Sequence, residues 1–107
     1  MSTQLKRLEA QIGKIKQELL ALGPMRPGSI TRQYRQPKEK ARPFYQISYT
    51  RQMRSRSEYV RPENLAVLRK ETATFKRFRK LIDQWISIAL AASHLRVQDA
   101  QKKTRKI

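Results

Sequence analysis

Residues suited to acid–base or metal chemistry are few in this sequence. His94 is the only histidine, and it lies among small and apolar residues late in the chain. The eight carboxylates are scattered, with no pair at a spacing that suits acid–base catalysis or a two-metal site. The chain has no cysteine, which excludes disulfides and thiolate zinc sites, and it has no glycine-rich phosphate loop. We therefore expect no catalytic residue, no metal and no cofactor.

Positive charge is the strongest chemical signal. The 107 residues include 25 Lys and Arg against 8 Asp and Glu, a formal net charge of +17. Such an imbalance opposes compaction unless a polyanion neutralises it, and nucleic acid is the commonest such partner. The composition therefore predicts nucleic-acid binding, with a merely solubilising surface as the alternative.

Basic and aromatic residues are interleaved at strand-like spacing in residues 25–61. Arginine predominates among the basic ones, and its planar group suits bidentate contacts to phosphate. Tyr34 and Phe44 are candidates for stacking on unpaired bases, whereas Tyr45, Ile47 and Tyr49 are expected to face a helix. A second basic strip follows on a predicted helix, where a solvated face is the alternative. The predicted nucleic-acid-binding residues are Arg26, Arg32, Tyr34, Arg35, Lys38, Lys40, Arg42, Phe44, Arg51, Arg54, Arg56, Arg61, Arg69, Lys76 and Lys80.

A helix is predicted over residues 1–23, before this basic stretch. Its apolar residues recur at alternating spacings of three and four, which is typical of a narrow helix–helix seam. The seam residues are Leu5, Leu8, Ile12, Ile15, Leu19 and Leu22. They can pack on the second long helix of the same chain, or form a coiled coil with another subunit, and a dimer allows both.

A three-stranded antiparallel sheet is predicted over residues 28–61. Alternating residues indicate strands at 30–35, 44–51 and 55–60, with a polar loop at 36–43 bracketed by prolines. The turn type at Gln52, Met53 and Arg54 is not readable, because neither Gly nor Asn is present there. Three short strands need a helix over one face to be stable.

A long helix is predicted over residues 62–100, because Pro62 and Glu63 suit a first helical turn. The densest apolar region, from Leu81 to Leu90 around Trp85, is the expected core. Residues 101–107 are expected to form a basic tail. The predicted fold is thus one basic α+β domain over residues 1–100, with the two helices paired as a coiled-coil-like stem.

Three segments resemble a known family. Residues 23–35 read GPMRPGSITRQYR, residues 43–49 read PFYQISY and residues 59–63 read YVRPE. They are similar to a family of small uncharacterised prokaryotic proteins with the motifs GPxxxGSxxRQY and GPYYxxS, followed by one helix. That family carries a cysteine cluster where this chain has residues 36–42 and no cysteine. The resemblance covers about residues 20–85, and it implies a link to mobile elements and phages but no assigned activity.

The sequence as a whole predicts a non-catalytic, nucleic-acid-binding accessory or regulatory protein. The resemblance to the mobile-element family favours DNA as the target. The alternative target is a structured RNA, and the chain would then be a subunit of a ribonucleoprotein. The alternative class is a protein–protein adaptor that acts through its helices, alone or as a homodimer. We expect no signal peptide in residues 1–22 and no membrane span, because the most apolar window, residues 85–92, is too short. A cytoplasmic location is therefore expected.

Overall fold

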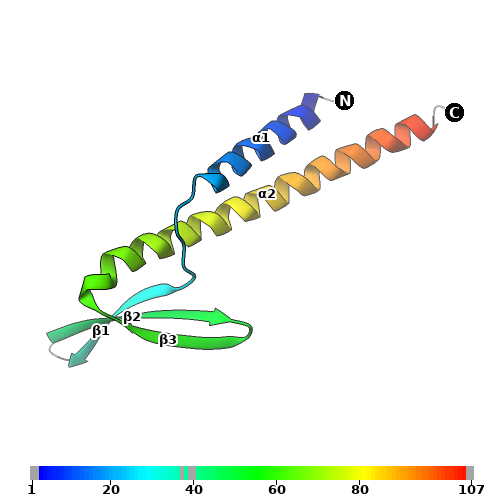
Figure 1. The fold of residues 1–107 in the computed structure, drawn as a ribbon. Coiled ribbons are helices and arrows are strands. Elements are labelled where there is room, and N and C mark those ends of the chain that lie inside the picture. Colours follow the sequence, from blue (N-terminus) through cyan, green and yellow to red (C-terminus); the bar gives the residue numbers. More distant parts are fainter. Residues whose placement is uncertain (1–2, 37, 39–40, 106–107) are drawn as a thin grey trace. The chain divides into compact units, whose positions relative to one another are not determined.

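The fold is α+β, as the sequence predicts. The computed structural model describes the backbone of residues 3–36, 38 and 41–105, and the side chains of these residues except 36, 41, 42 and 103–105. A first helix is followed by three antiparallel strands and a long second helix (Figure 1). The chain groups into two compact units, whereas the sequence analysis assigns residues 1–100 to one domain. We call Met1–Leu22 with Phe78–Ile107 the helical unit, and Gly23–Arg77 the sheet unit.

The helical unit is an antiparallel pair of helices. Helix α1 spans Thr3–Leu20, and it lies beside the later part of α2, which spans Leu65–Arg105 (Figure 1). Glu9 accepts a hydrogen bond of 3.1 Å from Arg96, while the Lys16 ammonium lies 5.3 Å from the centre of the Trp85 ring. The early part of α1 therefore meets the late part of α2, which confirms the predicted helix pairing.

The predicted seam forms the α1 side of this contact. Leu5 and Ile15 are buried and the remaining seam residues, Leu8, Ile12, Leu19 and Leu22, are half-buried. On α2 the fully buried residues are Leu81 and Ala92. The expected core from Leu81 to Leu90 is therefore only partly correct, because Leu90 is 69% exposed.

The sheet unit contains a sheet of strand order β1-β2-β3, with β1 at Ser29–Gln36, β2 at Ala41–Arg51 and β3 at Arg54–Val60. Both pairings are antiparallel. Their register places the odd-numbered residues of β2 on the same face as the even-numbered residues of β1 and β3.

One face of the sheet is covered and the other is open. On the covered face Ile47 and Val60 are 1% and 2% exposed, and the Arg69 guanidinium of α2 lies 5.4 Å from the centre of the Tyr45 ring. The expectation that Tyr45, Ile47 and Tyr49 face a helix agrees with this arrangement. The open face carries two hydroxyl pairs across the strands: Ser48 with Ser57 at 2.9 Å and Thr50 with Ser55 at 3.1 Å.

The strands extend further than the sequence predicts at the β1–β2 connection. The predicted loop at residues 36–43 is too long, because β1 reaches Gln36 and β2 begins at Ala41. Pro43 lies within β2, opposite Tyr34 of β1. A proline is tolerated there because β3 ends at Val60, opposite Tyr45, so β2 has no hydrogen-bonded neighbour on its other side at residue 43.

A 3-10 turn at Pro62–Asn64 leads into α2, as the Pro-Glu pair indicates. At its other end α2 continues to Arg105, so residues 101–105, which are expected as a basic tail, are helical. Lys and Arg are good helix formers and suit a helix C-terminus, which explains why the helix passes the last apolar residues.

Candidate nucleic-acid interface

The sheet unit holds most of the positive charge. Residues 23–77 include fourteen Lys and Arg against four Asp and Glu, a balance of +10 in the total of +17. Three groups of basic side chains can be distinguished by what they contact. They lie in a pocket on the covered face, on the open face, and at the turn end of the β2–β3 hairpin.

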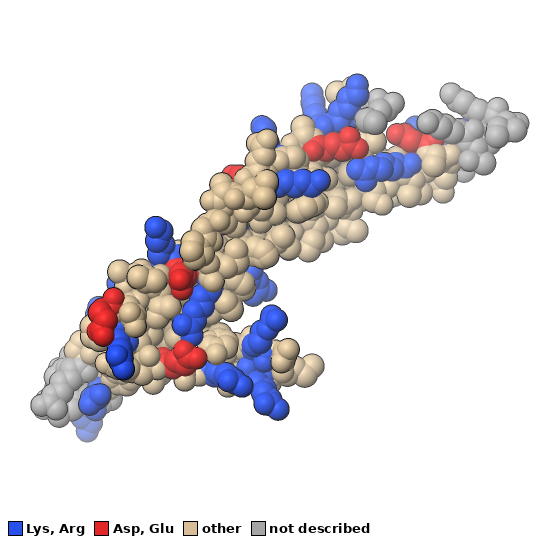
Figure 2. Space-filling view, viewed as in Figure 1, with Lys and Arg blue, Asp and Glu red and all other residues tan. Residues whose placement is uncertain are grey.

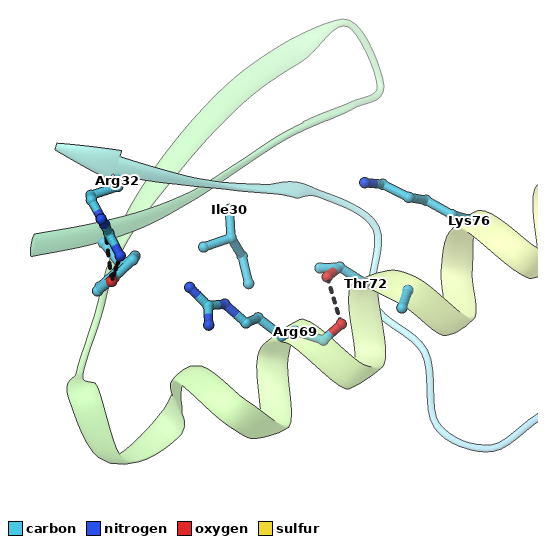
Figure 3. Close-up of a pocket in the computed structure, with 7 residues that line it drawn as sticks. Ile30, Arg32, Arg69, Thr72 and Lys76 are labelled. Carbon is cyan, nitrogen blue, oxygen red and sulfur yellow. Dashed lines mark hydrogen bonds between the residues drawn. The ribbon is translucent and has the colours of Figure 1, made fainter.

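The pocket lies between the covered face and the first part of α2. It has a volume of about 560 Å³, and the cations Arg32, Arg69 and Lys76 line it together with Tyr45 (Figure 3). Of the described residues that line it, none is acidic; the others are Ile30, Thr72 and Ala73. Arg69 and Lys76 are seven residues apart on a helix, which places both on the face of α2 that meets β1. The pocket is therefore a cationic site with an aromatic wall.

Tyr45 fixes the positions of two arginines in this pocket. The Arg32 guanidinium donates to the Tyr45 hydroxyl at 3.0 and 3.2 Å, and its centre lies 5.6 Å from the Tyr45 ring. The hydrogen bond from Arg32, with the positive charge of Arg69, lowers the pKa of the Tyr45 phenol. Hydrogen bonds to Tyr34 and Tyr45 raise the pKa of Arg32 further above its usual value. Arg32 therefore stays charged, and both guanidinium groups are held against Tyr45 before any ligand arrives.

Arg26 pairs with a carboxylate, whereas the arginines of the pocket are held against Tyr45. Its guanidinium forms a 2.7 Å ion pair with Glu58 and lies 5.7 Å from the centre of the Tyr49 ring. Tyr49 donates to the other oxygen of Glu58 at 3.2 Å, and the Arg26 amide donates to the Glu71 carbonyl at 3.1 Å. The pKa of Glu58 is lowered, chiefly by the hydrogen bond from Arg26. Arg26 thus ties the segment before β1 to both β3 and α2.

The open face carries one arginine–aromatic pair. Arg35 of β1 lies 5.8 Å from the centre of the half-buried Phe44 ring, and Tyr59 of β3 is 57% exposed. Phe44 and Tyr59 are diagonal neighbours, because Tyr59 pairs with Gln46. A flat aromatic surface with an adjacent guanidinium is the kind of surface on which unpaired bases stack.

The turn end of the hairpin is basic and exposed. Arg51 and Arg54 pair directly across the strands, and Arg56 follows on β3. Lys and Arg side chains gather around this end of the hairpin in Figure 2. Within the part of the chain that the structure describes, neither Arg51 nor Arg54 has a hydrogen bond or ion pair to another side chain.

The turn itself has two residues, Gln52 and Met53, with φ angles of 53° and 64°. Positive φ at both positions defines a type I′ turn, in which Asn and Gly are strongly preferred. A side chain in this left-handed region costs about 1–2 kcal/mol. Met53 is also 100% exposed.

The remaining predicted residues do not form one group with these. Lys38 and Arg61 are exposed, Lys38 in the β1–β2 connection and Arg61 directly after β3. Lys80 belongs to the helical unit and does not line the pocket with Arg69 and Lys76. Lys40 lies outside the described residues. The backbone of Arg42 is part of β2, but its side chain lies outside the described part of the structure.

Two functional candidates were missed by the sequence analysis. Tyr45 was expected only as core, yet its ring and hydroxyl position two arginines. The signal for it is the pairing of Arg32 with Tyr45, which needs the strand register. Met53 was missed because the turn type was not readable. Gly and Asn, which are the usual signal for such a turn, are absent at these two positions.

Comparison with known proteins gives no relative: no family model, curated protein or solved structure matches this chain. The resemblance to the mobile-element family therefore stays a prediction. Among the described residues, no helix is long and apolar enough to cross a membrane, and no three or more His, Cys, Asp or Glu side chains lie where they could hold a metal ion.

Proposed function

We propose that this chain is a non-catalytic nucleic-acid-binding accessory or regulatory protein, acting on DNA in the cytoplasm of a prokaryote and linked to a mobile element or phage. The observation that carries the proposal is the cationic pocket of Arg32, Arg69 and Lys76. The link to mobile elements rests on the sequence resemblance alone.

The pocket has the chemistry of a phosphate site. Guanidinium groups bind phosphate oxygens through two parallel N–H donors, and Lys adds a point charge. Arg32 and Arg69 are both held against Tyr45, so less side-chain freedom is lost when an anion binds. With no acidic residue among the described lining, an incoming phosphate meets attraction from three sides. A backbone phosphate of a nucleic acid fits this description.

The direct test is a titration of the protein into labelled duplex DNA, single-stranded DNA and a structured RNA at several salt concentrations. The variant Arg69→Ala/Lys76→Ala removes two exposed cations from the pocket. The matched control is Lys6→Ala/Arg7→Ala, which removes one Lys and one Arg from exposed positions of α1 in the helical unit.

We expect the pocket variant to bind duplex DNA more weakly and with a flatter salt dependence. Each lost phosphate contact reduces the log–log slope by about 0.9, so two lost contacts reduce it by about 1.8. The control should change the slope by less than half as much. Equal losses in the two variants would mean that only total charge matters, and the proposal of a defined site would fail.

A second candidate function is RNA binding as a ribonucleoprotein subunit. The Arg35–Phe44 pair with the exposed Tyr59 favours it, since single-stranded loops are recognised by stacking on aromatic and arginine side chains. The variant Phe44→Leu/Tyr59→Ser keeps an apolar side chain at residue 44 and a hydroxyl at residue 59, but removes both rings. A loss of RNA affinity without a loss of duplex affinity would favour this candidate.

The adaptor alternative rests on a different surface from the one that the sequence indicates. The predicted seam is covered by α2, but Ile86, Leu90 and Val97 of α2 are each more than half exposed. Their spacing of four and seven places them on one face of the helix. A protein partner, including a second copy of the chain, would therefore use this stripe. Replacing Leu90 with Gln should then abolish partner binding and leave nucleic-acid affinity unchanged.

A further inference from the structure

The β2–β3 hairpin ends as a two-stranded ribbon. The last pair between β1 and β2 joins Ser29 to Ser48, so residues 49–56 continue beyond the edge of β1. Three residues of each strand project by about 10 Å at about 3.3 Å per residue. The turn end of this ribbon therefore reaches past the three-stranded part of the sheet.

The root of the ribbon is fixed on both faces. On the covered face, Tyr49 donates to Glu58, which also binds Arg26. On the open face, the Ser48–Ser57 and Thr50–Ser55 hydroxyl pairs join the two strands. Because side chains from both strands hold the root of the ribbon, a force that acts on the turn is transmitted to the sheet.

The tip, by contrast, breaks three local rules of stability. Arg51 and Arg54 oppose each other across the strands, and like charges in that position repel. Gln52 and Met53 adopt positive φ without Gly or Asn. Met53 leaves its whole side chain in water. Departures from local conformational and electrostatic preference that no other interaction offsets are expected at functional sites.

We propose that Met53 is a wedge that enters between base pairs of duplex DNA, with Arg51 and Arg54 on the phosphates at either side. Exposed apolar side chains, including Met, are inserted between base steps by proteins that kink DNA. The duplex relieves the repulsion between the two arginines and removes Met53 from water. Duplex DNA is favoured over RNA because proteins that insert such wedges enter from the minor groove of DNA, where β-strands can also bind, whereas double-stranded RNA is recognised mostly by its shape and by contacts to its 2′-hydroxyls and phosphates. The inference rests on the proposed nucleic-acid-binding function and specifies its mode.

The test uses the full chain and a duplex with 2-aminopurine at a central TA step, where DNA unstacks most easily. The fluorescence of 2-aminopurine rises when the base loses its neighbours, and donor and acceptor dyes at the two ends report bending. Three variants are compared with the wild type. Met53→Gly removes the wedge, Met53→Leu keeps an apolar wedge, and Gln52→Asn relieves the turn while it leaves Met53 in place.

We expect the wild type, Met53→Leu and Gln52→Asn to raise the 2-aminopurine signal and to bend the duplex. Met53→Gly should lose most of both signals and about threefold to tenfold in affinity, although its unfolding midpoint in urea should rise. Greater stability with less unstacking excludes misfolding as the cause of the loss.

Two results would overturn the wedge. One is a wild-type protein that binds the duplex without unstacking or bending it; the other is a Met53→Gly variant that unstacks as the wild type does. Either result leaves the proposed function intact, because duplex binding is still observed. A wild type that binds no duplex DNA, or binds structured RNA in preference to it, overturns the wedge and the DNA-binding proposal together.

Discussion

Replacing Gly28 with Ala should destabilise the sheet unit strongly, because Gly28 precedes β1 in a conformation and a space that exclude a side chain. Its φ is +141°, and an added Cβ would lie 2.9 Å from Cγ1 and 3.1 Å from Cδ1 of Ile47, and 3.2 Å from the Ser48 carbonyl oxygen. Ile47 is only 1% exposed, so any movement of its side chain disturbs other buried groups. Backbone strain of about 1–3 kcal/mol and overpacking of about 1–3 kcal/mol apply together. We expect Gly28→Ala to lower the free energy of unfolding by about 2–6 kcal/mol.

The assay is urea unfolding followed by circular dichroism, in a double-mutant cycle with Ile47→Ala. Ile47→Ala removes both Cγ1 and Cδ1, and alone should cost about 2–5 kcal/mol. Because the double variant has no clash at these atoms, it should be more stable than the sum of the single effects by about 1–2 kcal/mol. Additive effects, or a Gly28→Ala cost below about 0.5 kcal/mol, would refute the packing argument.

Three further outcomes are expected. The hydrogen bond from Arg32 lowers the pKa of the Tyr45 phenol. In an alkaline titration followed by tyrosinate absorbance, one phenol should therefore ionise at a lower pH than is usual for tyrosine, and Arg32→Ala should abolish this early step. The hydrogen bond from Arg26 lowers the pKa of Glu58. The stabilisation by ionised Glu58 is therefore complete above the unfolded-state pKa of this carboxyl and is lost as the pH falls through its folded-state pKa. Glu58→Gln should remove that part of the acid dependence of the melting temperature. Leu81→Ala should cost about 2–5 kcal/mol in thermal or urea unfolding, because Leu81 is fully buried in the helical unit; a cost below about 1 kcal/mol would contradict its place in the core.

Periodicity made the elements predictable, because each one buries a single face. The apolar residues of α1 recur at three and four, and those that pack most tightly, Leu5 and Ile15, belong to that seam. The alternation in β2 likewise assigned Ile47 to the covered face, where it is buried. Local patterns of this kind depend only on the period of the backbone, so they can be read without the tertiary fold.

Features that depend on partners across the fold were not predictable. Pro43 reads as a loop residue, and it is tolerated in β2 only because β3 ends at Val60. Leu90 reads as core, but it lies on the side of α2 away from α1 and is exposed. The type I′ turn at Gln52 and Met53 has no sequence signal, because strand pairing and not local preference sets its φ angles.

Of the candidate site, the part that lies on one helix was predictable, and the part that depends on contacts between elements was not. The seven-residue spacing of Arg69 and Lys76 indicates a shared helix face. It does not indicate which face of the sheet that helix covers, and so it could not place Arg32 in the same pocket. Arg26 was predicted to bind nucleic acid, yet its ion pair with Glu58 gives it a structural role.

The division of aromatic residues between the two units provides separate optical reporters. The only tryptophan, Trp85, lies beneath Lys16 in the helical unit, whereas all four tyrosines belong to the sheet unit. Selective excitation of tryptophan therefore follows the unfolding of the helix pair, and tyrosine absorbance follows the sheet in the same sample. Helix α2 contributes residues to both units. Coincident transitions would mean that this shared helix makes the two units one cooperative system, and separate transitions would mean that the sheet unit can be isolated with its binding surface intact.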